Sequence, residues 1–279
     1  MPEEPPSADS WTWPQLRARR VVVERDGVLA LDKPPGLSVM GERHDTDVVE
    51  LAERAGERLH PVHRIDKVTS GLVLLATDLA AHGPLTRQFA DRSARKGYLA
   101  VVEGDRLPER FTVDLPLGTG RKGRVRIAAP RERLHYDAAD ARWSVDPADL
   151  LPGKPHYPSA TEVHRLLVAD GRTLLLVLPR TGRRHQIRVH LAWTGTPIVG
   201  DPLFRAPDGA APAERTHLHA WRLRLPESEP ELAIVAEPDA GFLSPVVAAG
   251  PAALGTALDT ADRIWTAHTA TGTAPNGTR

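Results

Sequence analysis

Apolar residues in the first third of the chain group into short β-rich runs and one stretch with helical spacing. Two valine- and leucine-rich runs flank Asp26-Gly27, a dipeptide typical of a tight turn, so residues 21–31 are predicted to form a β-hairpin. Residues 45–59 have apolar positions at helical intervals and begin with possible N-cap residues. The continuous apolar run 72–76 predicts a strand that is buried on both faces.

The same alternation continues through the rest of the chain. The pattern predicts a helix over 80–92 and a strand over 98–102, and then long loops with a few strands over the Pro-, Gly- and charge-rich residues 105–157. A second buried strand, 173–178, precedes a helix over 183–194. Strands and helices that alternate without a regular βαβ period favour an α+β fold over a doubly wound sheet.

The two ends of the chain differ in composition from its centre. Residues 1–18 are acidic and proline-rich at their start and are predicted to form a flexible leader. Residues 19–267 are predicted to form one domain, which ends in a short helix near 252–265. The Ala-, Thr- and Gly-rich residues 268–279 are predicted to form a disordered tail.

Composition excludes several classes of protein. The chain has no cysteine, which excludes disulfides, thiolate metal sites and cysteine nucleophiles. No apolar run reaches the roughly 18 residues that suggest a membrane span, and the N-terminus lacks the basic start and apolar stretch of a secretory signal. We therefore expect a cytoplasmic protein that does not contact a membrane.

The formal net charge is zero, but the charges are unevenly distributed. Seven acids and two bases follow Pro226, so this stretch carries −5 and residues 1–225 carry +5. A modestly basic body is compatible with binding phosphate groups, although charge alone does not establish it.

The segment 63–71, His-Arg-Ile-Asp-Lys-Val-Thr-Ser-Gly, places the carboxylate of Asp66 among three potential cations, just before a buried strand. Neighbouring positive charge favours the ionised form of a carboxyl group. Such a carboxylate can serve as a nucleophile or a base, or simply as a salt-bridge partner in a loop. Taken alone, the segment does not distinguish these roles.

A second cluster of polar residues occupies the start of the helix predicted after residue 182, in the segment 181–191, Thr-Gly-Arg-Arg-His-Gln-Ile-Arg-Val-His-Leu. If the helix begins at residue 183, Arg184 and Arg188 lie four apart on one face. An arginine at the border of the apolar stripe can point inward and pair with a buried acid, and an arginine-rich first turn also suits a phosphate. A solvated basic face is the alternative interpretation.

Together the two segments resemble the signatures of the RluA-type family of pseudouridine synthases, which modify ribosomal and transfer RNA. Residues 63–71 match its His-Arg-Leu-Asp-x-x-Thr-Ser-Gly, and residues 181–191 with 195–201 match Thr-Gly-Arg-Thr-His-Gln-Ile-Arg-Val-His-Leu and Gly-x-Pro-Ile-x-Gly-Asp. Four shorter matches occur in the family's order: Leu31–Gly36, Arg95–Ala100, Ala160–Glu162 and Leu218–Ala220. The resemblance covers about residues 20–225.

The resemblance implies an α+β catalytic fold with a mixed, mainly antiparallel central sheet and flanking helices and loops. It also implies an RNA pseudouridine synthase that isomerises a specific uridine of structured ribosomal or transfer RNA after flipping the base. It assigns the catalytic roles to three residues: Asp66 as nucleophile, Tyr98 stacked on the flipped base, and Arg188 in a salt bridge with Asp66. Contacts to the RNA are expected from six further residues, His63, Arg64, Arg183, Arg184, His185 and Gln186. An isomerisation needs no cofactor or metal, and we expect a monomer.

Besides Ile65, which replaces the family's Leu, two departures concern the expected RNA face and the surroundings of Tyr98, and the chain carries no recognisable S4-type RNA-binding module. Arg184 stands where the family usually has Thr or Ser, which adds a charge to the expected RNA face, and Gly97 replaces a bulkier residue beside Tyr98. Only about 20 residues precede the first predicted strand, so target choice is expected to rest on the catalytic domain and to favour a compact stem-loop.

Three alternatives compete with this interpretation. A glycoside or nucleoside hydrolase would need a second carboxylate, for which Asp78 and Asp201 are the candidates. The chain has 12 histidines, and a zinc site would need three or four histidine or carboxylate side chains to converge. His185 and His190 do not share a helix face well. A relative that binds RNA without catalysis would keep the fold, but the trio of Asp66, Tyr98 and Arg188 argues against it.

Overall fold

A computed structural model describes residues 11–41, 46–120, 123–153, 155–204 and 214–270. The chain divides into two compact units. The first unit comprises Met1–Lys96 and Leu218–Asp239, and the second comprises Gly97–His217 and Ala240–Arg279. Both units draw on separate stretches of the region 19–267, and the assignment of that region to one catalytic domain stays a prediction.

The first unit contains a sheet with the strand order β1-β2-β4-β14, in which β3 pairs with β4 and β15 with β14. Only the β4–β14 pair among them is parallel. Its strands are β1 (Val21–Arg25), β2 (Val28–Lys33), β3 (His60–Pro61), β4 (Ser70–Ala76), β14 (Leu218–Leu225) and β15 (Leu232–Val235). Its helices are α1 (Trp13–Arg20), α2 (Val48–Arg54) and α3 (Leu79–Ala90).

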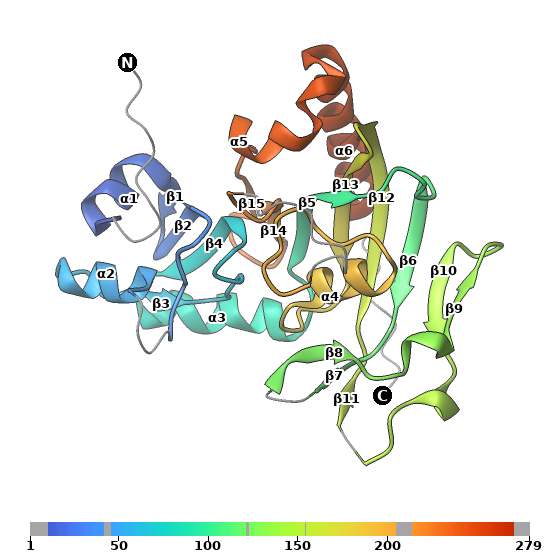
Figure 1. The fold of residues 1–279 in the computed structure, drawn as a ribbon. Coiled ribbons are helices and arrows are strands. Elements are labelled where there is room, and N and C mark those ends of the chain that lie inside the picture. The colour runs from blue at the N-terminus through green and yellow to red at the C-terminus, as the bar shows by residue number, and fades with distance from the viewer. Residues whose placement is uncertain (1–10, 42–45, 121–122, 154, 205–213, 271–279) are drawn as a thin grey trace. The chain divides into compact units, whose positions relative to one another are not determined.

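The hairpin and the buried strand predicted for this unit are confirmed. Asp26 and Gly27 both adopt positive φ, 48° and 76°, as the tight turn between β1 and β2 requires. All seven residues of β4 are buried. Figure 1 shows β4 beside β2, with α3 running along the same unit.

The N-terminal segment is not a flexible leader throughout. Residues 1–10 lie outside the described part of the chain, but Trp13–Arg20 forms α1, and Trp11, Trp13 and Leu16 are buried. Arg20 also pairs with Asp32 at 2.9 Å. The prediction rested on the acidic, proline-rich start of the sequence and did not take account of Trp11 and Trp13, whose burial holds this helix in place.

The polar residues before α2 and α3 fix where these helices begin. Asp47, rather than an earlier residue, caps α2 by accepting the N–H of Glu50 at 2.9 Å. Asp78 caps α3 by accepting the N–H of Ala81 at 2.8 Å. An aspartate at the N-cap satisfies a backbone donor that the helix itself leaves unpaired.

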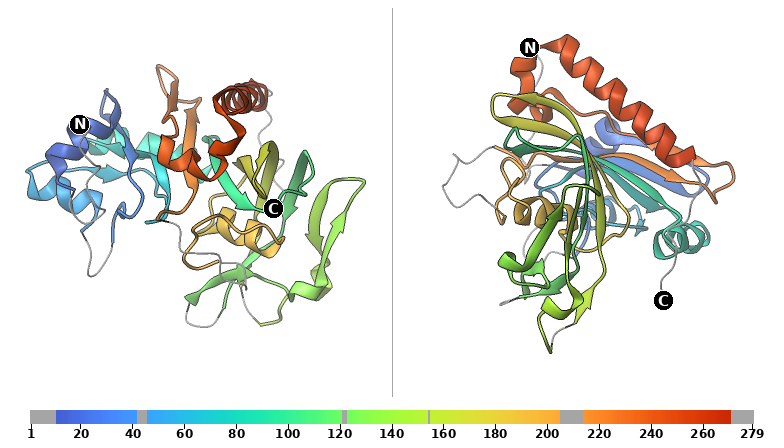
Figure 2. Two further views of the ribbon diagram at one scale, coloured as in Figure 1. Left: turned by 45° about the horizontal axis from the view of Figure 1, so that its top comes forward. Right: turned by 90° about the vertical axis from the view of Figure 1, so that its right-hand side faces the viewer.

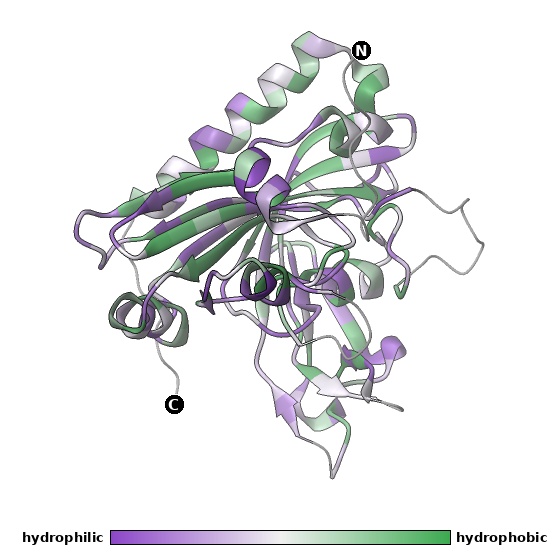
Figure 3. Ribbon diagram, turned by 90° about the vertical axis from the view of Figure 1, so that its left-hand side faces the viewer, coloured by the Kyte–Doolittle hydropathy of each residue, from purple (hydrophilic) through white to green (hydrophobic). Residues whose placement is uncertain are grey.

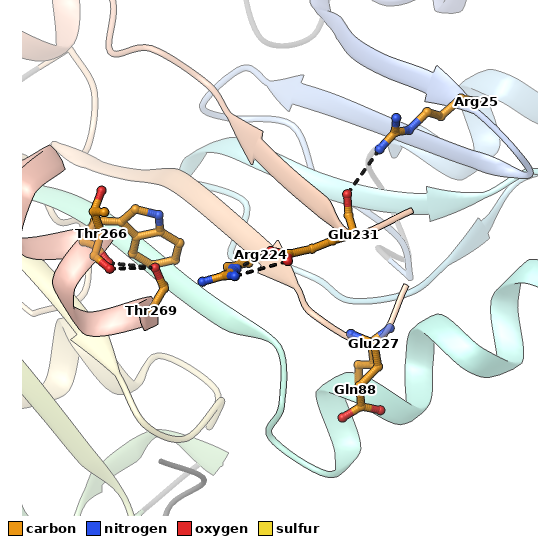
Figure 4. Close-up of polar contacts among 8 residues, drawn as sticks. Arg25, Gln88, Arg224, Glu227, Glu231, Thr266 and Thr269 are labelled. Atoms are coloured by element: carbon orange, nitrogen blue, oxygen red, sulfur yellow. Dashed lines mark hydrogen bonds and ion pairs between the residues drawn. The ribbon is translucent and has the colours of Figure 1, made fainter. Parts of the chain in front are cut away.

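Polar contacts also tie the β14–β15 hairpin to the rest of the first unit (Figure 4). Glu231 forms an ion pair with Arg224 across the hairpin, and its carbonyl accepts a hydrogen bond from Arg25 at 3.4 Å. The side-chain carbonyl of Gln88, on α3, accepts the N–H of Glu227 at 3.1 Å. The C-terminal strands thus complete a unit that begins near the N-terminus.

The second unit contains a sheet in the order β5-β13-β12-β6-β10-β9 and a separate sheet in the order β11-β7-β8. All pairs in it are antiparallel except β6 with β10. Its strands are β5 (Arg95–Glu103), β6 (Arg110–Asp114), β7 (Leu117–Thr119), β8 (Val125–Ile127), β9 (Leu134–Asp137), β10 (Arg142–Val145), β11 (His156–Tyr157), β12 (Ala160–Ala169) and β13 (Arg172–Pro179). Its helices are α4 (Gln186–Trp193), α5 (Ala240–Leu243), α6 (Pro251–Ala270) and the 3-10 turns Arg131–Arg133, Pro147–Asp149 and Ser244–Ala249.

The long C-terminal helix α6 packs on β12 (Figure 2). Its buried residues Ala257, Ala261 and Trp265 recur at four-residue intervals, so they form one apolar stripe. Figure 3 shows the corresponding mixture of apolar and polar positions along the helix. Residues 268–270, predicted to start a disordered tail, belong to this helix, and residues 271–279 lie outside the described part.

The prediction of an α+β fold with a mixed, mainly antiparallel sheet is confirmed. Across the described residues, no single helix has the length and apolar composition needed to cross a membrane. The pair 240–249 and 251–270 meets that test only when joined across a 115° bend.

Candidate active site

Asp66 lies in the loop between β3 and β4, and is partly buried. The N–H of Thr69 donates to its backbone carbonyl at 3.0 Å, which closes a tight turn before β4 begins. The next residue, Ser70, is buried, and its Oγ lies 2.9 Å from Nδ1 of His219. The turn that carries Asp66 is therefore anchored at its C-terminal end to β14.

Lys33 holds the same loop from the other side. Its side chain is fully buried, and Nζ donates to the carbonyl oxygens of Pro34 at 2.8 Å and Lys67 at 3.2 Å. The N–H of Gly36 donates to the same carbonyl of Lys67 at 2.8 Å. A buried ammonium group needs such acceptors, so the turn that follows Lys33 is fixed against the Asp66 loop. The sequence match at Leu31–Gly36 did not reveal this contact.

His63 is not one of the cations that surround Asp66. Its burial, together with the nearby charge of Lys96, lowers the pKa of His63 to about 3, so the ring is neutral near pH 7. Nε2 accepts the N–H of Leu74 at 3.1 Å, and the ring stacks on Phe89 with centroids 4.6 Å apart. The three potential cations counted in the sequence thus reduce to Lys67 and the exposed Arg64.

The helix of the second cluster begins later than predicted, because α4 starts at Gln186 rather than residue 183. His185 precedes it in the left-handed region, with φ of 57°. Arg184 therefore lies outside the helix, and the expectation that it shares a helix face with Arg188 is wrong. A left-handed residue breaks the helical path, and the apolar spacing of the sequence does not reveal it.

Gln186 is buried and organises the loop before α4. Its side-chain oxygen accepts from Oγ1 of Thr181 at 2.6 Å and from the N–H of Arg183 at 3.0 Å. Its side-chain nitrogen donates to the carbonyl of Ala160 and to Oγ1 of Thr161, both at 3.0 Å. Gln186 thus has a structural task that the sequence interpretation did not include, and its contact with RNA stays a prediction.

Arg188 points into the protein and pairs with Asp201. Nε lies 2.6 Å from Oδ2 and Nη2 lies 2.9 Å from Oδ1, and the two side chains are only 3% and 1% exposed. Burial acts to raise the pKa of Asp201, but the bonds from Arg188 and from the backbone N–H groups of Leu203 and Phe204 outweigh it, so the pKa is lowered. A buried acid as partner for an arginine of this helix was one of the interpretations of the sequence, and Asp201 is the final residue of the Gly-x-Pro-Ile-x-Gly-Asp match.

The loop before α4 presents cations beside the β11-β7-β8 sheet. The guanidinium of Arg183 lies 5.5 Å from the ring centre of Tyr157, and Arg184 donates to the carbonyl of Gly123 at 2.6 Å. Arg126 and Arg131 both lie 5.3 Å from the ring of Trp193. No acidic residue occurs in the sequence over 115–131 or 171–200, so these two segments carry a positive net charge, which favours contact with phosphate groups.

Tyr98 lies on β5 opposite Val177 of β13 and is partly exposed. The predicted catalytic residues come from both units, since Asp66 belongs to the first and Tyr98 and Arg188 to the second. The salt bridge expected between Asp66 and Arg188 stays a prediction.

The structure also bears on the alternative chemistries. Of the two carboxylates available to a hydrolase, Asp78 caps α3 and Asp201 pairs with Arg188. His190 is buried between Oγ1 of Thr161 at 2.8 Å and the carbonyl of Leu115 at 3.0 Å. Within the described residues, no three His, Asp or Glu side chains are grouped to hold a metal ion.

Comparison with known proteins identifies the family. The model of the RNA pseudouridylate synthase family matches residues 27–193. The dual-specificity RNA pseudouridine synthase RluA of Escherichia coli O6:H1 is 35% identical over 208 residues, which cover 74% of this chain and 85% of that protein. The RluA protein of Vibrio vulnificus is 34% identical over 224 residues, 78% of this chain and 79% of that protein.

Among solved structures, human RNA pseudouridylate synthase domain containing 4 superposes with a TM-score of 0.66 at 25% identity, covering 83% of this chain and 94% of that one. The sequence and fold comparisons thus point to the same family. The chain belongs to the RNA pseudouridylate synthase family, as an RluA-type isomerase.

Proposed function

We propose that this enzyme isomerises a specific uridine in a stem-loop of ribosomal or transfer RNA, with Asp66 as its nucleophile. In the reaction the bond between N1 and the sugar breaks, the base turns, and C5 forms the new bond to the sugar. The proton on C5 leaves and N1 gains one, so no oxidant, reductant or leaving group is consumed.

The construction of the Asp66 loop carries this proposal. An ordinary surface loop would not be fixed by a fully buried lysine on one side and by a serine–histidine contact on the other. Contacts of this kind hold a reacting group in one geometry. Much of an enzyme's rate enhancement comes from positioning the reacting groups in this way. Asp66 is the carboxylate that this framework presents.

The second unit supplies the other parts of the proposed mechanism. A base inside a stem must be extruded before its glycosidic bond can be attacked. Tyr98, partly exposed on β5, would stack on the extruded base, and the cationic loop with Arg183 and Arg184 would bind phosphates of the same strand. Arg188, already oriented by a buried acid, would steady the charge of Asp66 during the reaction.

A tritium-release assay tests the proposal. RNA labelled with tritium at C5 of uridine loses the label to water when C5 forms the new bond. Asp66→Asn should abolish release from ribosomal and transfer RNA while binding to the same RNA stays within about one order of magnitude, because the amide keeps the shape of the carboxylate. Asp91→Asn, which alters an exposed aspartate at the end of α3, is the matched control and should retain activity.

Turnover by Asp66→Asn would refute the nucleophile assignment. If the wild-type protein is folded and binds RNA but releases no tritium from any RNA, the chain is an RNA-binding relative without catalytic activity.

A further inference from the structure

The buried ion pair between Arg188 and Asp201 is the centre of a larger cluster of contacts, whose outer members are partly exposed. Oδ1 of Asp201 accepts the N–H groups of Leu203 and Phe204 at 2.8 and 3.0 Å, in addition to its bond from Arg188. These bonds fold residues 201–204 into a turn that follows directly from the carboxylate. One side chain therefore fixes both a guanidinium and a backbone turn.

The turn places an aromatic ring against the same guanidinium. Cζ of Arg188 lies 5.3 Å from the ring centre of Phe204, and the ring of His185 meets that of Phe204 edge-on, with centroids 5.8 Å apart. A ring over a guanidinium contributes a modest attraction and restricts its rotation. Arg188 is thus held on its edge by Asp201 and on its face by Phe204.

The geometry of the pair shows which edge of the Arg188 guanidinium Asp201 occupies. Asp201 binds the edge formed by Nε and Nη2. A guanidinium has a second edge, formed by Nη1 and the other hydrogen of Nη2, which can bind another carboxylate or an oxyanion. An acid on the first edge orients the second edge and offsets the charge of a buried cation.

We propose that Asp201 is a positioning residue for catalysis, which acts by orienting the guanidinium of Arg188 toward the reacting carboxylate. This inference rests on the proposed function, because it assigns Arg188 to the same reaction as Asp66. Asp201 itself does not need to touch the RNA. Its removal should therefore lower kcat and leave the KM for RNA nearly unchanged.

Asp201→Asn separates the two tasks of this carboxylate. The amide oxygen can replace Oδ1 and keep the bonds from Nη2 of Arg188 and from the two backbone N–H groups. The amide nitrogen would replace Oδ2, which lies 2.6 Å from Nε of Arg188, and two donors cannot bond to each other. The variant thus keeps the 201–204 turn and disturbs the orientation of Arg188.

Glu162→Gln provides the matched control. Glu162 is another buried carboxylate of the second unit, paired with Arg110, Arg180 and His164, none of which belongs to the Arg188 cluster. Both variants remove a buried negative charge, so both should reduce stability. Only Asp201→Asn should reduce kcat, by roughly 10- to 100-fold, as expected for a misplaced catalytic group.

The measurement is tritium release under saturating and limiting RNA, on the folded fraction of each variant. A kcat loss in Asp201→Asn with the KM within roughly threefold of wild type, and no such loss in Glu162→Gln, supports the proposal. A wild-type kcat in Asp201→Asn, or an equal loss in both variants, overturns it. If instead Asp66→Asn retains turnover, the proposed nucleophile fails, whatever Asp201→Asn shows.

Discussion

A single added methyl group at Gly71 should be costly. Gly71 lies in β4, five residues after Asp66, and is paired with Ala220 of β14. A Cβ at Gly71 would lie 2.2 Å from the carbonyl oxygen and 2.7 Å from the nitrogen of Ala220. Its φ of +99° is also unfavourable for any residue with a side chain.

The cost of Gly71→Ala has two parts. The positive φ costs about 1–2 kcal/mol for an L-residue. The overlap is with backbone rather than with a flexible side chain, so β4 and β14 must separate, and overpacking of this kind costs about 1–3 kcal/mol more. We expect the free energy of unfolding to fall by about 2–5 kcal/mol, which is a large share of the stability of an ordinary domain.

Urea unfolding of three variants isolates the steric part. Gly171 also has positive φ, +71°, but a Cβ added there would have no other atom within 4 Å, so Gly171→Ala should show only the backbone cost. Gly255 lies inside α6 with open space around it, and Gly255→Ala should stabilise the protein by up to about 1 kcal/mol. If Gly71→Ala costs no more than Gly171→Ala, the close approach of β4 and β14 is not a constraint on this fold.

Two further predictions concern other parts of the structure. Trp13→Ala should lower the free energy of unfolding, measured in urea, by about 3–5 kcal/mol, because Trp13 is fully buried in α1. Trp13→Phe should cost much less. If both variants have equal and negligible effects, the flexible-leader interpretation is restored. Burial lowers the pKa of His190 to about 4 from an ordinary value near 6.5, so the unfolded chain binds a proton in this interval and the folded chain does not. The stability that this neutral histidine contributes above pH 6.5 should therefore be lost as the pH falls through 4, by about 3 kcal/mol. Unfolding free energies of wild type and His190→Gln, compared from pH 7 to 4, should show a shallower loss in the variant, and parallel curves would contradict this assignment.

Local patterns in the sequence predict most of the secondary structure. The hairpin at Asp26-Gly27 and the buried strand β4 follow from turn chemistry and apolar runs, which act between neighbours along the chain. The predicted start of α4 is wrong because His185 adopts a left-handed conformation, which the spacing of apolar residues does not encode. The helix α1 does not emerge from the sequence pattern, because it is stabilised by the burial of Trp13 and of the preceding Trp11 rather than by a long local periodicity.

The sequence by itself determined the family and the candidate residues, because the two long motifs that contain these residues occur in the same order as in the family. Tertiary structure alone decided the partners of these residues. Lys33 reaches the carbonyl of Lys67, and Arg188 binds Asp201, because folding brings together groups that are 34 and 13 residues apart. It also decided that His63 is neutral, since the pKa of a histidine depends on the water and the charges around it in the folded protein.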